Sequence, residues 1–288
     1  MAFLTAKGIS RTAIALLTRT LVLPMTVTRV PGDEFAGANG DTITIRVPVP
    51  SVARTQASPG ASITYDDVDE VAVDVTLAHL YHATRITDED LSLALESFAE
   101  QVSLKQVSAV ATRAEDQLAG TMNVLPSELD IAAGGADVEA QVLAAREALG
   151  EANVPSGMRW LAVSPQVATF LLKLDKFSRV DASGTDSALR DAIIGRIYGF
   201  QVVESNALNT GTAVAYHQSG FVFGNRTPVT PRGAADSATA TEGGVGLRQI
   251  FQYDPDVLSD ASVVSTFAGG SLVDADRVVK LTTGGAPS

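Results

Sequence analysis

The sequence predicts an α+β protein, and three observations support that fold class. Two runs of alternating apolar and polar residues, 42–47 and 71–77, have the period of half-exposed β-strands. A long helical pattern follows between 87 and 120, and beyond residue 136 short strands and short helices mix. Because an extended hairpin and a long helix precede this mixed segment, an α+β architecture is expected.

The two alternating runs predict an extended β-hairpin. They are separated by a stretch rich in Pro, Ser and Gly, residues 48–61, that has no strand pattern of its own. At about 3.3 Å per residue, one arm and half of the tip would reach about 40 Å. A compact domain does not need such a reach to cover itself, so we expect the hairpin to rest on something else.

The helical pattern between 87 and 120 has a well-marked start. Thr87 and Asp90 can form a capping box, and acidic side chains follow Thr87 at the positive end of the helix dipole. One apolar stripe then continues without Gly or Pro until Gly120, which is expected to end the helix. Such a helix has about 31 residues and is about 46 Å long, far above the mean of about 11 to 12 residues.

The composition excludes several kinds of chemistry. The chain has 288 residues, of which 45% are hydrophobic and 19% charged, which is typical of a globular protein with a sizeable core. It has no cysteine, so a disulfide framework, a thiolate metal site and a cysteine nucleophile are all impossible. No stretch has the 18 or so apolar residues of a membrane span, and the sequence is expected to be soluble and cytosolic.

The net charge of −12 is unevenly distributed. Residues 1–32 contain four basic residues and no acid, so the remainder carries −16. This basic arm is either a solvated tail or a segment that lies on the acidic surface of a neighbouring copy. The acidic body argues against general nucleic-acid affinity, because phosphate binding needs a basic surface.

Beyond residue 136 the pattern is that of an α/β lobe. Asp137 is expected to cap a helix, and Pro165 to begin another directly after a buried strand at 159–163. The sequence further predicts a short helix at 187–194 and a loop at 227–246. Further strands are expected at 196–204, 212–216, 220–223, 247–253, 262–267 and 273–281.

The residues most able to carry chemistry do not converge on a reaction centre. His79 and His82 lie in a strand-like run whose alternation places them on opposite faces, which is unsuitable for a shared metal. The acidic run at 66–70 lacks the spacing of a Ca²⁺ loop. It is expected to form a solvated hairpin edge or to pair with arginines such as Arg46 or Arg54, on the same or an adjacent subunit.

Two glycine- or serine-containing motifs are also incomplete. The segment Gly243–Gly246 lacks the Lys-Ser/Thr of a phosphate loop, and Ser164-Pro165 lacks the glycines of a nucleophile elbow. No catalytic residue, cofactor or metal is therefore predicted, and the protein is not expected to be an enzyme.

Five segments, in their order along the chain, resemble a known family. They are Gly40–Pro48, Val73–Leu77, Ile86–Leu91, Ile194–Ser205 and the ending from Phe267 to Val279. The chain resembles tailed-bacteriophage major capsid proteins with the HK97-type fold. In that family an N-terminal arm leads into an extended hairpin (the E-loop), a long spine helix in a peripheral domain and an α/β axial domain.

The resemblance implies a self-assembling coat protein of the virion, assembled in the host cytoplasm. Hexamers and pentamers would form an icosahedral shell around packaged double-stranded DNA that is not bound sequence-specifically. The expected partners are copies of the chain, a separate scaffolding protein, a portal and a decoration protein, with no membrane. The domains would be an arm at 1–35, the E-loop at 36–78, a peripheral domain at 79–135 with its spine helix at 88–119, an axial domain at 136–246 and returning strands with a tail at 247–288.

One departure from the family bears on how subunits hold together. Some members join neighbours by an isopeptide bond from an E-loop lysine, but this chain has no lysine between Lys7 and Lys105. Noncovalent contacts are therefore expected. The candidates for subunit contacts are Arg11, Arg19, Arg46, Arg54, Asp66 and Asp67. Two alternatives stay open: an encapsulin-like shell protein that encloses enzyme cargo, and a soluble α/β enzyme with an accessory hairpin.

Overall fold

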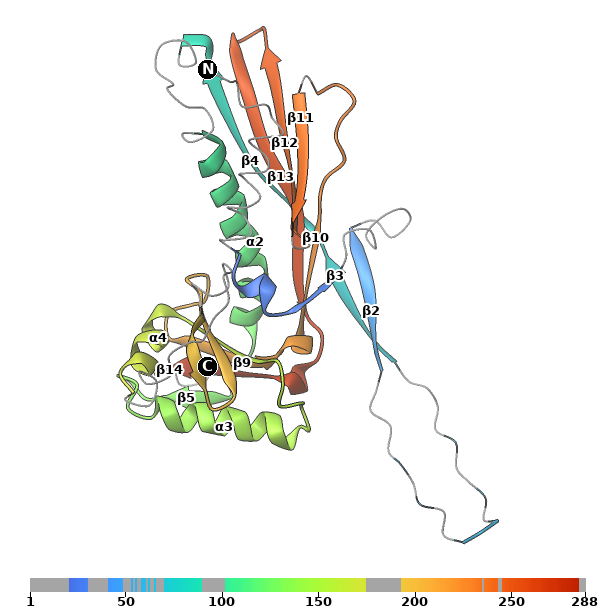
Figure 1. Cartoon of the computed structure of the whole chain (residues 1–288), viewed down its shortest axis with the longest axis vertical. Helices are drawn as coiled ribbons and strands as arrows, with labels where there is room; N and C mark the ends of the chain where they lie inside the picture. Colours follow the sequence, from blue (N-terminus) through green and yellow to red (C-terminus); the bar gives the residue numbers. More distant parts are fainter. Residues whose placement is uncertain are drawn as a thin grey trace.

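The computed structural model describes residues 21–30, 41–48, 53, 55, 58–60, 62, 65, 70–89, 102–174, 193–234, 236–242 and 245–284. They form a long sheet backed by a helix, a compact second sheet with its own helices, and a projecting two-stranded hairpin (Figure 1). No helix in this part of the chain is both long and apolar enough to cross a bilayer.

The long sheet is organised by β13 (Ser259–Leu272), its longest strand. One edge of β13 pairs with β4 (Ala78–Thr87), and the other pairs with β12 (Val245–Asp254) and then with β10 (Phe221–Arg226), all antiparallel. The sheet is completed by β11 (Asp236–Glu242) beside β12 and by β1 (Thr28–Val30), which runs parallel to β10.

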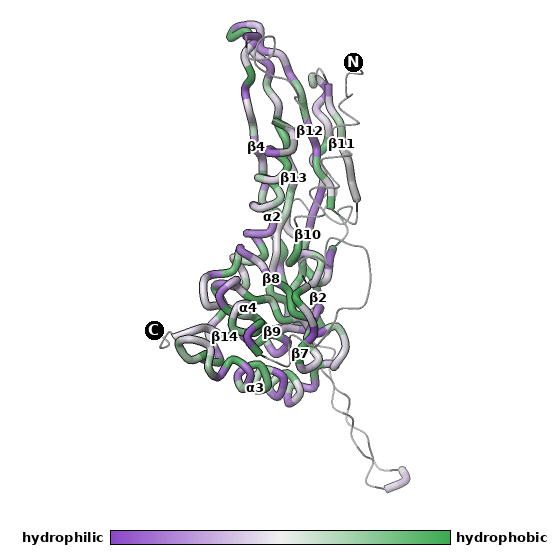
Figure 2. Tube along the Cα trace, turned by 60° about the vertical axis from the view of Figure 1, so that its left-hand side comes forward, coloured by the Kyte–Doolittle hydropathy of each residue, from purple (hydrophilic) through white to green (hydrophobic). Residues whose placement is uncertain are grey.

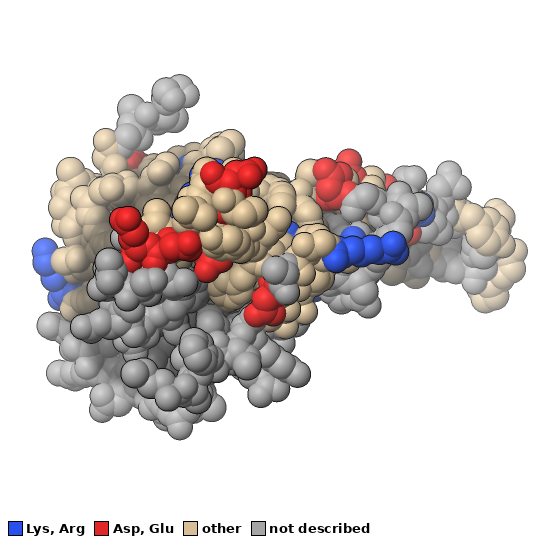
Figure 3. Space-filling model, turned by 90° about the horizontal axis from the view of Figure 1, so that it is seen from above, with Lys and Arg blue, Asp and Glu red and all other residues tan. Residues whose placement is uncertain are grey.

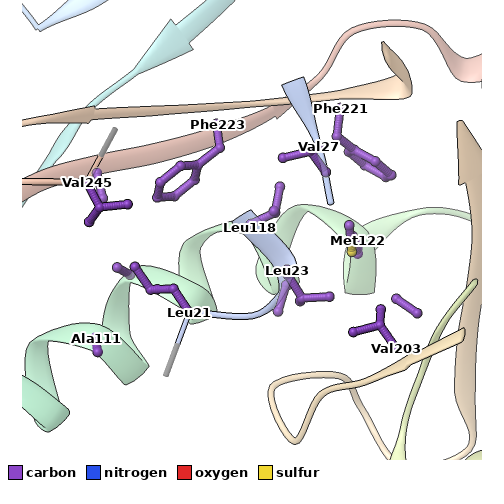
Figure 4. Packing of buried hydrophobic residues seen from close by; sticks show 14 of the residues in the cluster. Leu21, Leu23, Val27, Ala111, Leu118, Met122, Val203, Phe221, Phe223 and Val245 are labelled. Atoms are coloured by element: carbon purple, nitrogen blue, oxygen red, sulfur yellow. The ribbon is translucent and has the colours of Figure 1, made fainter. Parts of the chain in front are cut away.

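Helix α2 (Leu104–Val124) covers one face of this sheet. Its buried apolar residues pack with those of the sheet and of the segment 21–27, and Figure 4 shows Leu23 close to Leu118, with Leu21 on the side of Ala111. A short 3₁₀ helix, η1 (Leu23–Met25), brings the segment 21–27 onto the helix. The core of the elongated half is therefore shared by an N-terminal segment, a helix and a sheet.

The predicted end of this helix at Gly120 is wrong. Gly120 is exposed and lies inside α2, which continues to Val124 because Leu118 and Met122 keep its last turns on the core. Pro126 then favours extended backbone at Leu125, where φ is −56° and ψ is 146°. The predicted beginning of the helix at Thr87–Asp90 cannot be traced into α2, since residues 90–101 lie outside the described residues.

The second sheet is buried on both faces. Its strand order is β5 (Leu129–Ile131), β14 (Val278–Thr283), β9 (Thr212–His217), β6 (Arg159–Val163), β8 (Phe200–Glu204) and β7 (Ile193–Ile197). Alternate residues of β6 face different cores: Trp160 and Ala162 pack toward α2, whereas Leu161 and Val163 pack toward α3 (Val138–Glu151) and α4 (Pro165–Leu172). Burial on both sides explains the continuous apolar runs, and Figure 2 shows hydrophobic residues concentrated around β8, β9 and β10.

Three other predictions differ from the structure. The predicted single strand 196–204 is a hairpin of β7 and β8, in which Tyr198 and Gly199 have positive φ values of 47° and 89°, as a tight hairpin turn requires. Ile193 already belongs to β7, so the predicted helix 187–194 is wrong at its end, and residues 187–192 lie outside the described part. The predicted loop 227–246 contains β11, so the range 136–246 contributes strands to both sheets.

The predicted hairpin is confirmed. β2 (Thr42–Pro48) pairs antiparallel with β3 (Glu70–Thr76), in a register that runs from Thr42↔Thr76 to Pro48↔Glu70. β3 passes through Leu77 directly into β4, so the hairpin is anchored to the long sheet and projects away from it (Figure 1).

Candidate subunit-contact surfaces

The hairpin has one polar face. Across its strands Thr44 Oγ1 donates a hydrogen bond of 2.6 Å to Asp74 Oδ1, and Arg46 Nη1 lies 3.3 Å from Glu70 Oε2. This is the pairing expected between Arg46 and the acidic run, and it occurs within one chain. Both partners are well exposed, so the pair sets the pairing of the strands more than it adds stability.

The opposite face of the hairpin is apolar, and its cover ends before the strands do. Ile43, Ile45 and Val47 stand opposite Val75, Val73 and Val71 in the pairing register. At the base Val75 is fully buried and packs in a cluster with Val30 and Val222 of the body, but Val71 is 53% exposed. An isolated two-stranded hairpin is only marginally stable in water, so this uncovered apolar ribbon is a surface suited to be covered by another subunit.

The face of the long sheet that points away from α2 is also partly apolar. Tyr81 is 68% exposed there. Ala83, two residues further along β4, lies on the same face and pairs with Val263, which in turn pairs with Ile250. His79 lies on the same face, with its ring 4.6 Å from that of Phe267, whereas His82 faces α2. The two histidines therefore lie on opposite faces as predicted, and no group of three metal-ligating side chains occurs among the described residues.

The far end of the long sheet is acidic. Tyr253 Oη donates a hydrogen bond of 3.0 Å to Asp88 Oδ2, and this bond raises the pKa of Tyr253. Asp254 and Asp260 stand nearby, with Arg85 3.6 Å from Asp254. In the view from above, acidic side chains are more prominent than basic ones (Figure 3).

A buried polar junction joins the N-terminal segment, α2 and the second sheet. Glu115 of α2 is only 7% exposed and accepts hydrogen bonds from Val22 N at 2.7 Å and Ser205 Oγ at 2.6 Å. Burial raises the pKa of the Glu115 carboxyl group. Beside it the hydroxyl groups of Thr26 and Tyr216 are 2.5 Å apart, and burial raises the pKa of Tyr216. This junction was not predicted from the sequence. Glu115, an acid that directly follows Ala114 of the apolar stripe, was a usable signal for a buried polar contact.

The structure places only one of the six predicted contact residues. Arg46 lies on the polar face of the hairpin, as described above. The others, Arg11, Arg19, Arg54, Asp66 and Asp67, lie outside the described residues and stay predictions. Ser164 occupies the N-cap position of α4, but its buried hydroxyl makes no hydrogen bond to any residue that the structure describes. Of the glycine-rich segment, Gly243 and Gly244 lie outside the described residues.

A family model described as phage capsid protein matches residues 62–280, which is more than half of the chain. The chain belongs to the phage capsid protein family. As a capsid protein it is a structural subunit of a shell made of many copies, and its place is the capsid of the virion. Among curated proteins, none matches the sequence.

Solved structures agree with this capsid protein in fold. A Mycobacterium phage Che8 structure has 21% identity and a TM-score of 0.60, with 89% of each chain covered. The capsid of Ralstonia phage GP4 has 11% identity and a TM-score of 0.64, with 91% of this chain and 88% of that chain covered. A virus-like particle from Pyrococcus furiosus has 12% identity and a TM-score of 0.56, with coverage of 95% and 97%. The predicted α+β, HK97-type capsid fold is confirmed.

Proposed function

We propose that this capsid protein is the major coat protein of a tailed bacteriophage. It assembles through hexamers and pentamers into an icosahedral shell around packaged double-stranded DNA, and it assembles in the host cytoplasm. A separate scaffolding protein, a portal and a decoration protein are its proposed partners. The protein performs no catalysis; its task is mechanical.

The proposed division of the chain follows the predicted ranges. The arm is 1–35, the E-loop 36–78, the peripheral domain 79–135, the axial domain 136–246 and the returning strands 247–288. The long sheet with α2 is the main body of the peripheral half, and the second sheet with α3 and α4 is that of the axial half. β10 and β11 cross from the axial range into the long sheet and tie the two halves together.

The observation that carries the proposal is the apolar face of the hairpin. This face continues along the strands beyond the part that the rest of the chain covers. We propose that a neighbouring subunit covers Val47, Val71 and Val73, and that Arg11, Arg54, Asp66 and Asp67 supply charged contacts around this overlap. Each contact is modest, but a closed shell repeats it many times, and its stability is collective. These contacts between subunits are noncovalent, because the hairpin contains no lysine that could form an isopeptide bond.

The acidic body supports DNA enclosure without DNA binding. A shell lined by negative charge repels the phosphate backbone and leaves packaged DNA free to move. We propose that the acidic surface of the body faces the lumen. A shell structure with a basic lumen would refute this placement.

Electron microscopy of the purified chain, alone and with the scaffolding protein of the same phage, tests the proposal. We expect closed shells, tubes or rings of five and six subunits; a monomer at every concentration would contradict it. Val71→Asp should reduce particle yield at least tenfold without unfolding the chain. Ala72→Asp is the matched control, since Ala72 is an exposed neighbour on the polar face.

The contents of the particles separate this proposal from an enzyme-filled shell. Particles purified from infected cells should contain double-stranded DNA that resists nuclease until the shell is opened. Particles filled with a protein and free of genome would support a nanocompartment instead.

A further inference from the structure

The turn between β12 and β13 presents an apolar surface at the far end of the long sheet (Figure 1). Residues 255–258 of this turn are all exposed, and Val257 and Leu258 are 48% and 61% exposed. Leu258 also has a positive φ of 46°, a backbone conformation that bulky residues rarely adopt. Asp88 N donates a hydrogen bond of 3.2 Å to Leu258 O and so ties the turn to the end of β4. The fold therefore holds two large apolar side chains in contact with solvent.

Acidic residues surround this apolar surface. Asp254 and Asp260 flank the turn, and Asp256 lies within it. In the part of the chain that the structure describes, Arg85 is the only basic residue paired with one of them, 3.6 Å from Asp254. Two copies of the turn would repel each other, because like charges would meet around the apolar residues. The turn therefore fits a partner surface that is apolar and basic.

The loop 227–234 has this complementary character. The sequence 226–235 contains two arginines and no acid. Val229 of the loop is 78% exposed, and Arg232 is exposed and makes no ion pair with any described residue. The loop is held on the sheet by Arg248 of β12, whose Nη1 donates a hydrogen bond of 2.5 Å to Val229 O. A second exposed apolar residue thus lies in a surface of the opposite charge.

The turn and the anchored part of the loop are far apart within one chain. Arg248 is six residues before Asp254, the residue at which β12 enters the turn. At about 3.3 Å per residue, the point at which Arg248 holds the loop is about 20 Å from the turn. A contact between Val229 and Leu258 therefore needs two copies of the chain.

We propose that the turn 255–258 of one copy docks on the loop 227–234 of a neighbouring copy, with Leu258 against Val229 and Asp256 beside Arg232. The two surfaces differ, so each copy can offer its turn to one neighbour and its loop to another, as a heterologous contact requires. The opposite charges give this contact its direction. The inference rests on the proposed shell function and adds a contact surface that is separate from the hairpin.

Disulfide trapping in assembled particles tests the docking, because the protein has no cysteine of its own. Val257→Cys is combined with Thr230→Cys in the full-length chain, which leaves Leu258 and Val229 in place. After mild oxidation we expect a ladder of dimers and larger multimers on a non-reducing gel, at least tenfold stronger than with either single variant. Val257→Cys combined with Ser108→Cys, at an exposed site on α2, is the control and should give no ladder.

Exchange of the charges tests the same contact without a cross-link. Asp256→Lys and Arg232→Glu should each lower particle yield at least tenfold. The two changes in one chain should restore the yield to within about twofold of the unmodified protein, which a folding defect would not do. Glu151→Lys, an equal charge change at an exposed position of α3, should leave the yield within about twofold.

The other outcomes overturn the docking. A cross-linked single chain would mean that loop and turn meet within one copy, and dimers from Val257→Cys alone would mean that two turns meet. Particles that form without a ladder, or a double charge variant that stays defective, would mean that these two surfaces do not touch. Failure of the proposed function has a different signature, because the unmodified chain would then form no particles at all.

Discussion

The carbonyl oxygen of Thr76 lies so close to Gly269 that a β-carbon on Gly269 would overlap it. Thr76 is the last residue of the hairpin strand β3, and Gly269 lies toward the C-terminal end of the long strand β13. Gly270 leaves room in the same way for Leu118 of α2. The missing side chains of two consecutive glycines therefore let the hairpin and the spine helix pack closely on the same strand.

Replacement of Gly269 by alanine is expected to loosen the base of the hairpin. The β-carbon would meet backbone atoms, which cannot rotate away, and such overpacking costs about 1–3 kcal/mol. The free energy of unfolding of the unassembled chain, measured in urea, should fall accordingly. Gly120→Ala is the control: no atom lies within 4 Å of its β-carbon, and alanine should stabilise the helix by about 0.5–1 kcal/mol. An unchanged stability of Gly269→Ala would contradict the close approach.

Lys280 of β14 caps the end of α2 from a distant part of the chain. Its Nζ donates hydrogen bonds of 2.7 Å to Asn123 O and 2.8 Å to Leu125 O, and burial lowers the pKa of the ammonium group. Lys280→Met removes these bonds and leaves two carbonyl groups at the helix terminus unpaired, at a cost of about 1–3 kcal/mol. Lys105→Met, at an exposed site on α2, should change the unfolding free energy by less than about 0.5 kcal/mol. Equal effects of the two substitutions would argue against the cap.

The sequence predicted the hairpin and most strands because their signals are local. Residues 42–47 and 71–77 alternate with period two, and glycine and proline separate them, so pairing required no knowledge of the rest of the chain. The residue at which α2 ends could not be predicted from local sequence signals. A glycine in a helix costs about 1 kcal/mol, and the burial of Met122 beyond Gly120 outweighs that cost only because a core lies beneath it.

The missed strand and the missed junction have the same kind of cause. β11 is made mainly of Ala, Thr and Ser and has no large apolar residue, so only its pairing with β12 makes it a strand. Glu115 became informative only when the fold brought Val22 and Ser205 to it from 93 and 90 residues away in the sequence. Of the contact residues, Arg46 was found because its partner Glu70 lies in the adjacent strand of the same hairpin.

The ion pair between Arg46 and Glu70 should contribute little to the stability of a single chain. Their side chains are 76% and 41% exposed, and exposed pairs contribute about 0.2–1 kcal/mol. In a double-mutant cycle of Arg46→Gln and Glu70→Gln on unassembled protein, we expect a coupling below about 0.5 kcal/mol. If a neighbouring subunit covers the hairpin, the same variants should clearly reduce the yield of particles, even though they barely change the free energy of unfolding of the single chain. A coupling above 1 kcal/mol would indicate that the pair is chiefly an internal clasp.

His217 should make the protein less stable in mild acid. Burial lowers the pKa of His217, and the positive charges of Arg277 and Arg159 lower it further. The unfolded chain therefore binds a proton more readily than the native chain, so stability is full above the ordinary pKa of about 6.5 and is lost as pH falls from there toward the native pKa. Protonation would also remove the Nδ1 acceptor that receives the amide of Ser219.

Unfolding measured between pH 7.5 and 5.5 tests this expectation. His217→Asn keeps an acceptor near Ser219 but cannot be protonated, so its stability should fall less steeply than that of the unmodified chain. Parallel profiles of the two proteins would show that another group sets the acid sensitivity.

A buried polar seam should fix the rotation of α2 on the long sheet. Gln106 Nε2 donates to Ser262 O at 2.9 Å, and Ser262 Oγ donates back to Gln106 Oε1 at 2.8 Å. About one turn before Gln106, at the N-cap of α2, Ser103 Oγ accepts a hydrogen bond of 3.0 Å from Gln249 Nε2 of β12. Apolar contacts alone would allow α2 to shift along the sheet. These hydrogen bonds form in only one position of the helix, since any shift leaves buried polar groups unpaired.

Substitution at the seam tests that role. Gln106→Ala should lower the unfolding free energy by about 1–3 kcal/mol, because the buried Ser262 hydroxyl loses its acceptor. Ser262→Ala in the same chain removes that orphaned group, so the double variant should be more stable than the sum of the two single effects predicts, by about 1 kcal/mol. Ser108→Ala, at an exposed position of α2, serves as the control and should stay within about 0.5 kcal/mol. Strict additivity would mean that α2 is held by its apolar stripe alone and that its register has no polar lock.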